Sequence, residues 1–284
     1  MAKIRLAAFS DEAATSIQGQ IKELNNCGVY LTEPRFINGK NVADYNAKEC
    51  KEFCKIFADG GIKVWSVGSP LGKVDINVNF NEYIETIKRV CENACALETN
   101  KIRVFSFYNA YTERQKVLDN LNKMVEVASS FNVELYHENE KEIYGDNLAR
   151  VIDVLENVKG IKSVYDPANY IQVGEKSNDT LLALHNRSDY FHIKDVVEKT
   201  GELVPAGYGD GDINKLVGMI EKDTVLTLEP HLAVFDAFKQ VDNTEMKHKF
   251  KFTSNVEAFA FAVKSLKELL VKNGYREING EFVK

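Results

Sequence analysis

The chain has 284 residues, of which 44% are apolar, 10% aromatic and 27% charged, and this balance excludes wholesale disorder, a collagen-like fibre and a coiled-coil rod. Acidic residues outnumber basic ones by 42 to 36, which gives a net charge of −6. A protein that grips a phosphate backbone normally carries a basic excess, so we expect no nucleic-acid partner.

The N-terminal segment MAKIRLAAFSDEA reaches charged residues too early for a secretory signal peptide. No run approaches about 18 uncharged apolar residues, so no membrane span is expected. The five cysteines are an odd number in a long chain, which favours a reducing compartment and a cytoplasmic location. Four of them form pairs spaced i, i+4, and they are expected to be buried core residues: Cys50/Cys54 and Cys91/Cys95.

Short β-branched or aromatic runs alternate along the chain with longer runs of helical periodicity. The predicted strands are residues 3–10, 29–35, 62–67, 101–107, 133–138, 163–166, 190–194 and 224–229. A predicted helix follows each strand, at residues 13–26, 42–59, 80–97, 113–131, 147–157, 179–185, 212–221 and 256–273. Strict alternation predicts a parallel sheet, and at this length the fold expected is an α/β single-domain (β/α)8 TIM barrel over residues 1–284.

Two segments fall outside this repeat. Residues 231–252 form a long connection between the last strand and the last helix, and we interpret it as a loop or lid over the pocket, or as a contact between subunits. Barrels of this kind often self-associate, so a homo-oligomer is an open alternative. The aromatic residues of this connection are Phe235, Phe238, Phe250 and Phe252. The tail after Asn273 is short and polar.

Reactive side chains of a (β/α)8 barrel lie at the carboxyl ends of its strands. Here the last four predicted strands end in HENE (137–140), DPAN (166–169), HIKD (192–195) and EPH (229–231). Strand alternation places one group of side chains toward the barrel axis at equivalent depths: Glu138, Asp166, His192 and Glu229. The same alternation turns Tyr165, Ile193 and Leu228 toward the helices.

Three carboxylates do not crowd one barrel mouth without compensation, because burying a bare charge is costly. A single divalent cation supplies that compensation. Oxygen and imidazole ligands together suit Mn, Co, Zn, Ni or Fe better than Ca, which favours oxygen alone. The competing interpretation is a set of separate solvated or ion-paired residues at loop starts, and the common register of the four residues argues against it.

At this point the chain resembles the xylose isomerase-like barrels called sugar phosphate isomerases/epimerases. The resemblance lies in the segments HENEKEIYGD (137–146), YDPANY (165–170), YFHIKD (190–195), PAGYGDGD (205–212) and LEPHL (228–232). It extends over nearly the whole chain, because FSDEA (9–13) and GSPLGK (68–73) also fit. In that family one Glu, one Asp, one His and a second Glu bind one divalent metal, which implies the ligands Glu138, Asp166, His192 and Glu229.

The resemblance and the ligand chemistry together predict a metal-dependent isomerase or epimerase of a small sugar or sugar-like ketone. A metal on the carbonyl and neighbouring hydroxyl oxygens stabilises the enediolate that forms when the proton between them leaves. One carboxylate must take that proton and another return it on the opposite face. Glu138 and Glu229 are the expected acid/base pair and double as ligands, as in the epimerase branch of the family.

Other activities remain open. The same enediolate can expel a β-hydroxyl group, which would make the chain a dehydratase or lyase of the inosose dehydratase type. It could also be a carbohydrate-processing subunit that acts with a partner chain. The DNA-repair endonuclease branch uses a histidine-rich cluster of three metals, and five histidines with a net charge of −6 argue against it. A non-catalytic sugar-binding barrel would not need both glutamates.

Substrate contacts are expected from Lys194, Asn169, His231 and Lys73. Each has a competing interpretation: an ion pair of Lys194 with Asp195, a turn at Asn169, a structural rim residue at His231 and a surface lysine at Lys73. Glu33 and Arg35, at the end of the second strand, either contact the distal end of a sugar or lie on the surface. His137 should face away from the cavity and pack.

Three glycines alternate in the segment GYGDGD (207–212). The spacing and the position after the seventh strand do not fit the dinucleotide fingerprint, which follows a first strand. We interpret the segment as a mobile loop beside the metal, in which Tyr208 and Asp210 are candidate contacts.

Overall fold

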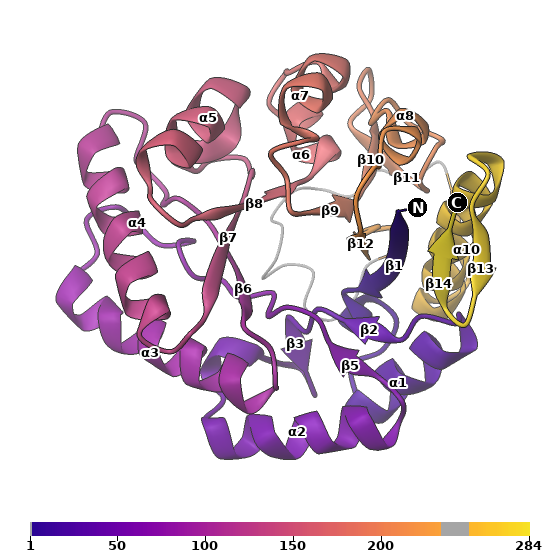
Figure 1. The fold of residues 1–284 in the computed structure, drawn as a ribbon, viewed down its shortest axis with the longest axis horizontal. Helices are drawn as coiled ribbons and strands as arrows, with labels where there is room; N and C mark the ends of the chain where they lie inside the picture. The colour runs from indigo at the N-terminus through magenta and orange to yellow at the C-terminus, as the bar shows by residue number, and fades with distance from the viewer. Residues whose placement is uncertain (1, 234–249) are drawn as a thin grey trace.

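The computed structural model describes residues 2–233 and 250–284 and confirms the predicted barrel (Figure 1). The strands of the ring are β1 (Lys3–Ala8), β2 (Leu31–Thr32), β5 (Lys63–Val64), β6 (Lys101–Val104), β7 (Glu134–Glu138), β8 (Lys162–Tyr165), β9 (Tyr190–Ile193) and β12 (Thr224–Leu228). They pair in parallel from β6 through β7, β8, β9 and β12 to β1, and from β1 through β2 to β5. A parallel bridge between Val67 and Ile102 closes the ring.

The predicted helices are all present and surround the strands (Figure 1). They are α1 (Ile17–Asn26), α2 (Ala47–Asp59), α3 (Phe80–Ala96), α4 (Arg114–Ser129), α5 (Leu148–Asn157), α7 (Ser177–Leu184), α8 (Ile213–Gly218) and α10 (Asn255–Lys272). Polar caps begin several of them. The side chain of Asn46 accepts the N–H of Glu49, whose carboxylate accepts the N–H of Asn46, and this reciprocal pair satisfies two donors at the start of α2.

Two apolar layers follow from strand alternation. The layer between strands and helices contains Tyr165, Ile193 and Leu228, as predicted. The barrel interior contains the side chains of opposite parity: Ala7, Leu31, Tyr136, Val164, Tyr190 and Val225. In β2, β7, β8, β9 and β12 this inner row ends in a polar residue, whereas in β1 it continues to Phe9, so the mouth of the barrel is mostly polar.

The structure also contains short elements that the sequence pattern did not predict. They are η1 (Ser10–Glu12), β3 (Phe36–Ile37), β4 (Lys40–Asn41), η2 (Val42–Asp44), η3 (Tyr144–Asp146), α6 (Pro167–Gln172), β10 (Asp195–Val197), β11 (Glu202–Val204), β13 (Arg276–Ile278) and β14 (Glu281–Val283). The short polar tail after Asn273 forms a hairpin, β13–β14, that the sequence pattern did not predict. β14 pairs antiparallel with β1, and Phe282 is buried.

Most of the 231–252 connection lies outside the described residues, including Phe235 and Phe238, so its roles as lid or contact stay predictions. Among the described residues, no helix has both the length and the apolar character needed to cross a bilayer. The prediction for the paired cysteines is half right. Cys50 and Cys91 are fully buried, whereas Cys54 is partly buried and Cys95 is exposed.

The alternating glycines wrap around one buried carboxylate, and the mobility predicted for this loop stays a prediction. Oδ2 of Asp195 accepts the N–H groups of Gly207 and Gly209 at 2.8 and 3.1 Å, and Oδ1 accepts those of Gly211 and Val196 at 2.9 Å each. A Cβ at position 209 or 211 would lie 2.4 or 2.7 Å from Oδ1. Glycine is therefore required there by close approach, and the loop is tied to β10.

Asp195→Ala is expected to lower the free energy of unfolding by about 3 kcal/mol, because several buried N–H donors lose a charged acceptor. Asp195→Asn keeps one oxygen acceptor and should cost less. The control is Asp210→Asn in the same loop, where Oδ2 accepts the N–H of Glu198; it should cost less than about 1 kcal/mol. Urea unfolding measures all three. Equal losses in the Asp195 and Asp210 variants would contradict the role given to Asp195.

Candidate metal centre

Four side chains from neighbouring strands meet at the carboxyl end of the barrel. Glu138 ends β7, Asp166 follows β8, His192 lies in β9 and Glu229 follows β12. Each can offer one ligand atom such that the four atoms lie within 4.8 Å of one another, and all four residues are buried. The structure therefore brings the four predicted ligand residues together in one cluster.

Each glutamate of the cluster has one oxygen bound by an arginine. Arg103 donates from Nη1 to Glu138 Oε2 at 2.7 Å, and Arg35 donates from Nη1 to Glu229 Oε1 at 3.0 Å. The remaining oxygens face Nδ1 of His192, with Glu138 Oε1 at 2.9 Å and Glu229 Oε2 at 3.2 Å. Nδ1 of His192 thus lies between two carboxylate oxygens.

Asp166 is fixed by its position at the start of a helix. Its Oδ1 accepts the N–H of Asn169 at 3.0 Å, which caps α6, and Pro167 occupies the first helical position. The side-chain amide of Asn139 makes two hydrogen bonds to the backbone of Asp166, both at 2.9 Å. Oδ2 is buried, accepts no hydrogen bond and lies 3.1 Å from Nζ of Lys194.

The imidazole of His192 is enclosed by the barrel interior. Its Nε2 lies 3.4 Å from Oε2 of Glu33, and its ring meets the rings of Phe9 and Tyr190 edge-on. Glu33 is itself held by hydrogen bonds from Tyr190 Oη at 2.9 Å and Thr227 Oγ1 at 3.0 Å. Nε2 therefore faces a protein carboxylate, and Nδ1 faces the other members of the cluster.

Burial and the neighbouring charges shift the pKa values of the residues in the cluster. Burial alone would raise the pKa of Glu138, but His192 and Arg103 hold it at about 2. Burial raises the pKa of Asp166 to about 7, although Lys194 opposes the shift. Burial would lower the pKa of His192, yet the carboxylates of Glu138 and Glu33 raise it well above its ordinary value. The cluster thus binds positive charge strongly.

These residues fit a divalent metal ion. Three carboxylates and one imidazole converge, and both Asp166 Oδ2 and Glu229 Oε2 are buried atoms without a hydrogen bond. Oxygen ligands with one imidazole suit Mn, Fe, Co, Ni or Zn. An ion there would be held by Glu138, Asp166, His192 and Glu229, and it would compensate the carboxylates directly.

Two predicted substrate residues lie beside the cluster. Lys194 is buried and pairs with Asp166, whereas Asp195 is taken up by the glycine loop, so the competing ion pair within the HIKD segment is wrong. Asn169 donates from Nδ2 to the carbonyl oxygen of Asn139 at 2.9 Å, while its Oδ1 is buried without a hydrogen-bond partner among the described residues. Substrate contact by either side chain stays a prediction.

The other two lie at the rim. His231 has a left-handed backbone (φ 46°), and its Nε2 lies 3.4 Å from both Glu12 Oε1 and Glu229 Oε1. Burial lowers the pKa of His231 to about 4. Nζ of Lys73 lies 2.9 Å from Oε2 of Glu140 and over the ring of Phe105. Both rim residues therefore have acidic neighbours in the structure, and their contact with substrate stays a prediction.

The sequence pattern missed several residues that surround the ligands. The surface interpretation of Glu33 and Arg35 is wrong, because both are buried and contact His192 and Glu229 respectively. Arg103 was not singled out. The sequence could have indicated it, because Arg103 occupies an inward position of the fourth predicted strand and a buried arginine there needs an acidic partner.

His137 packs against the strand beside it, as expected. Its Nε2 lies 3.0 Å from Oγ of Ser106, which accepts the N–H of Gly145 at 2.7 Å. Because Oγ accepts from the backbone, the hydroxyl proton is free to point at Nε2. The pair links β7 to η3, and the buried imidazole is neutral.

The buried imidazole of His137 makes stability fall with acid. Burial lowers its pKa from 6.5 to about 4, so the unfolded chain binds a proton here between these values that the folded chain does not. The resulting loss of unfolding free energy reaches about 3 kcal/mol at pH 4. We expect His137→Gln to show a shallower pH dependence in urea unfolding across that range. An unchanged slope would contradict this.

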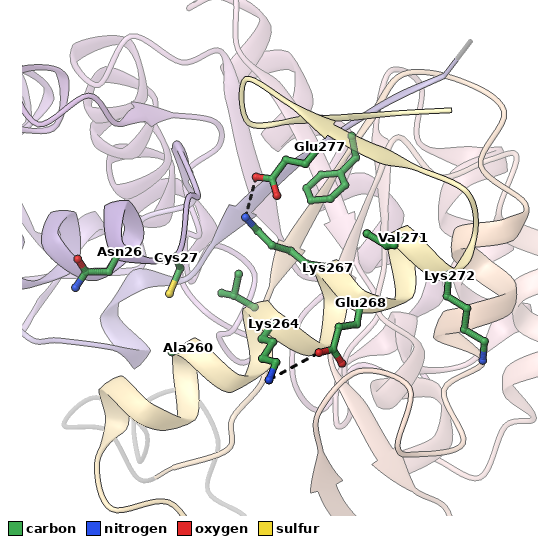
Figure 2. Close-up of a pocket in the computed structure, with 11 residues that line it drawn as sticks. Asn26, Cys27, Ala260, Lys264, Lys267, Glu268, Val271, Lys272 and Glu277 are labelled. Atoms are coloured by element: carbon green, nitrogen blue, oxygen red, sulfur yellow. Dashed lines mark hydrogen bonds and ion pairs between the residues drawn. The ribbon is translucent and has the colours of Figure 1, made fainter.

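A separate groove of about 580 Å³ lies on the outer face of the barrel, between α1, α10 and the C-terminal hairpin (Figure 2). Lys267 pairs there with Glu277 at 2.8 Å, and Lys264 lies 3.8 Å from Glu268. Four of its five charged side chains are thus paired, and none of the four clustered ligands lines it.

The fold and the cluster define a class, the (β/α)8 barrels with a candidate divalent-metal centre at the carboxyl ends of their strands. The model of the family described as "Xylose isomerase-like TIM barrel" matches residues 21–245, so the chain belongs to that family. No curated protein matches the sequence of this chain.

Several solved structures share the fold at low sequence identity. The probable 3-DHS dehydratase AsbF from Bacillus anthracis has a TM-score of 0.68 and 15% identity, with 94% of this chain and 99% of that chain covered. L-ribulose 3-epimerase has a TM-score of 0.68 and 17% identity, with 96% and 97% covered. A xylose isomerase-like TIM barrel protein from Mycobacterium smegmatis in complex with magnesium has a TM-score of 0.68 and 11% identity, with 96% and 98% covered.

Proposed function

We propose that the protein is a divalent-metal-dependent isomerase or epimerase of a small sugar or sugar-like ketone. The observation that carries this proposal is the convergence of Glu138, Asp166, His192 and Glu229 at the barrel mouth. Family membership and the structural likeness to an epimerase support it. The substrate is a small carbohydrate, and the cofactor is one divalent ion, for which Mn(II) is our first choice.

Glu138 and Glu229 are proposed as the acid/base pair. A bound metal would withdraw electrons from the carbonyl and hydroxyl oxygens of the substrate and so acidify the hydrogen between them. Glu138 is ionised at neutral pH, because its pKa lies at about 2, and Glu229 is held ionised by Lys194 and His192 despite its burial. An ionised carboxylate accepts the proton on one face, and the other glutamate must first take up a proton from water before it can return one on the opposite face.

Substrate contacts are proposed for Lys194, Asn169, His231 and Lys73. The buried ammonium group of Lys194 lies at the cluster and would bind a hydroxyl or carboxylate oxygen of the substrate. The free Oδ1 of Asn169 would accept a hydroxyl proton. His231 and Lys73 would contact the end of the substrate that lies toward the rim.

A dehydratase is the second candidate, and it is favoured by the structural likeness to a probable 3-DHS dehydratase. Both activities begin with the same proton abstraction. They differ in whether the intermediate is reprotonated or loses a β-hydroxyl group, which requires a nearby acid.

The test is proton NMR of ketoses, aldoses and inososes in D2O with purified protein and Mn(II). We expect deuterium to enter at a carbon next to the carbonyl and a new isomer to accumulate. Loss of water from the product would assign the dehydratase. The control is Glu229→Gln with the same metal load. Absence of exchange across the panel, with Mn(II) demonstrably bound, would reject a small free sugar and point to a larger glycoside or an absent partner chain.

A further inference from the structure

Two buried arginines hold the two glutamates of the centre in matching ways. Arg103 donates to Glu138 Oε2 at 2.7 Å, and Arg35 donates to Glu229 Oε1 at 3.0 Å. In each glutamate the other oxygen faces His192 Nδ1, at 2.9 and 3.2 Å. Each carboxylate therefore has one oxygen committed to a guanidinium group and one directed into the cluster.

The two arginines are fixed against the same aromatic ring. The guanidinium carbon of Arg35 lies 4.5 Å from the centre of the Phe9 ring, and that of Arg103 lies 5.4 Å from it. A Cβ at Gly68 would lie 2.5 Å from this ring and 3.4 Å from both arginine side chains. Arg35 is further anchored by Asp11 at 3.1 Å. The arrangement leaves the guanidinium groups little freedom to swing away.

A carboxylate binds a metal through one oxygen or through both, and a guanidinium group on one oxygen removes the second choice. Four residues that each offer one ligand atom would fill four positions of an ion that prefers six, which leaves about two. A hydroxy-ketone needs two positions, one for each oxygen. If Glu138 and Glu229 each bound through both oxygens, no position would remain.

We propose that Arg35 and Arg103 are positioning residues that restrict Glu229 and Glu138 to one-oxygen binding and so keep the substrate's positions open. The benefit to substrate binding rests on the proposed function, whereas the restriction of the two glutamates concerns only the bound metal. The arginines would keep two positions on the ion open for substrate without being ligands themselves.

The experiment counts exchangeable waters on Mn(II) bound to the protein, from the broadening of its EPR lines in oxygen-17-enriched water. We expect about two waters in the unchanged protein and about one in Arg103→Met or Arg35→Met, because the released oxygen joins the ion. Mn(II) should stay bound in both variants. Arg103→Lys keeps a charged donor and should restore the count toward that of the unchanged protein.

A water count that is equal in the unchanged protein and in both methionine variants would overturn the proposal. So would loss of Mn(II) from a variant that still unfolds cooperatively, because the arginine would then be needed for binding itself. Arg35→Met supplies an independent result if Arg103→Met does not fold. The measurement uses no substrate, so failure of deuterium exchange in the unchanged protein would reject the proposed function and leave this inference standing.

Discussion

Asp166→Ala is expected to abolish divalent-metal binding. Oδ2 of Asp166, which follows β8, is a buried oxygen of the cluster, and its only partner among the described residues is the ammonium group of Lys194 at 3.1 Å. We expect the affinity for Mn(II) to fall by at least about a hundredfold, the upper end of what residues around a ligand cost. Isothermal titration with Mn(II) measures it, and full occupancy in the variant would remove Asp166 from the ligand set.

Asp166→Asn separates the loss of the carboxylate charge from the loss of the helix cap. Asparagine caps a helix as well as aspartate does, so the hydrogen bond to the N–H of Asn169 at the start of α6 is kept. Both variants should lose the metal and the buried ion pair with Lys194, and Asp166→Ala should lose about 1 kcal/mol more of unfolding free energy through the missing cap. Mn(II) binding by the asparagine variant at full strength would show that the negative charge is not needed.

Glu229→Gln is expected to keep the fold and lose turnover by about 10²- to 10⁴-fold, the usual contribution of a general acid or base. The amide keeps one oxygen, which can accept from Arg35, and its NH2 group replaces the oxygen that faces His192. An amide does not take up the proton. The measurement is the rate of deuterium entry next to the carbonyl under saturating Mn(II). Retained exchange would remove Glu229 from the acid/base pair.

A matched control for this variant lies at the rim of the same mouth. Glu140 pairs with Lys73 and is partly exposed, and it belongs to no ligand set. Glu140→Gln also replaces one carboxylate at the barrel mouth by an amide. It should change the exchange rate only a few-fold. If both glutamine variants lost activity equally, a general electrostatic effect would explain the loss better than proton transfer by Glu229.

The ring of strands and helices was predictable because both periodicities are strong along the chain. Residues 224–229 predicted β12, and residues 256–273 predicted α10, each within a residue or two of the observed bounds. The inward direction of Glu138, Asp166, His192 and Glu229 followed from the same alternation. A strand's parity decides which side chains share a face, and the sequence contains that information directly.

The environment of the ligands was harder to predict. The alternation of side chains along a strand places Glu33 and Arg103 toward the barrel axis. Whether Glu33 reaches His192 and Arg103 reaches Glu138 depends on how far neighbouring strands are shifted along one another, which the local sequence does not reveal. β2 is also shorter than the predicted strand 29–35, so Glu33 and Arg35 follow it in the loop. Distances between residues far apart in the chain had to come from the structure.

The C-terminal hairpin had a local signal that went unused. Asn279 and Gly280 both have positive φ, 51° and 78°, and Asn-Gly is the preferred pair for a two-residue hairpin turn. The flanking strands are short and β13 is exposed, which hides the alternation that marks a half-buried strand. Phe282 alone carries the burial of this hairpin against β1.

The first strand of the chain is completed by its last ones. Ile4 pairs with Thr224 in β12, and Lys3 pairs with Val283 in β14. During synthesis, β1 therefore emerges before these partners, and the edge that β12 and β14 later cover stays unpaired until they are made. Closure of the ring is then a late event of translation.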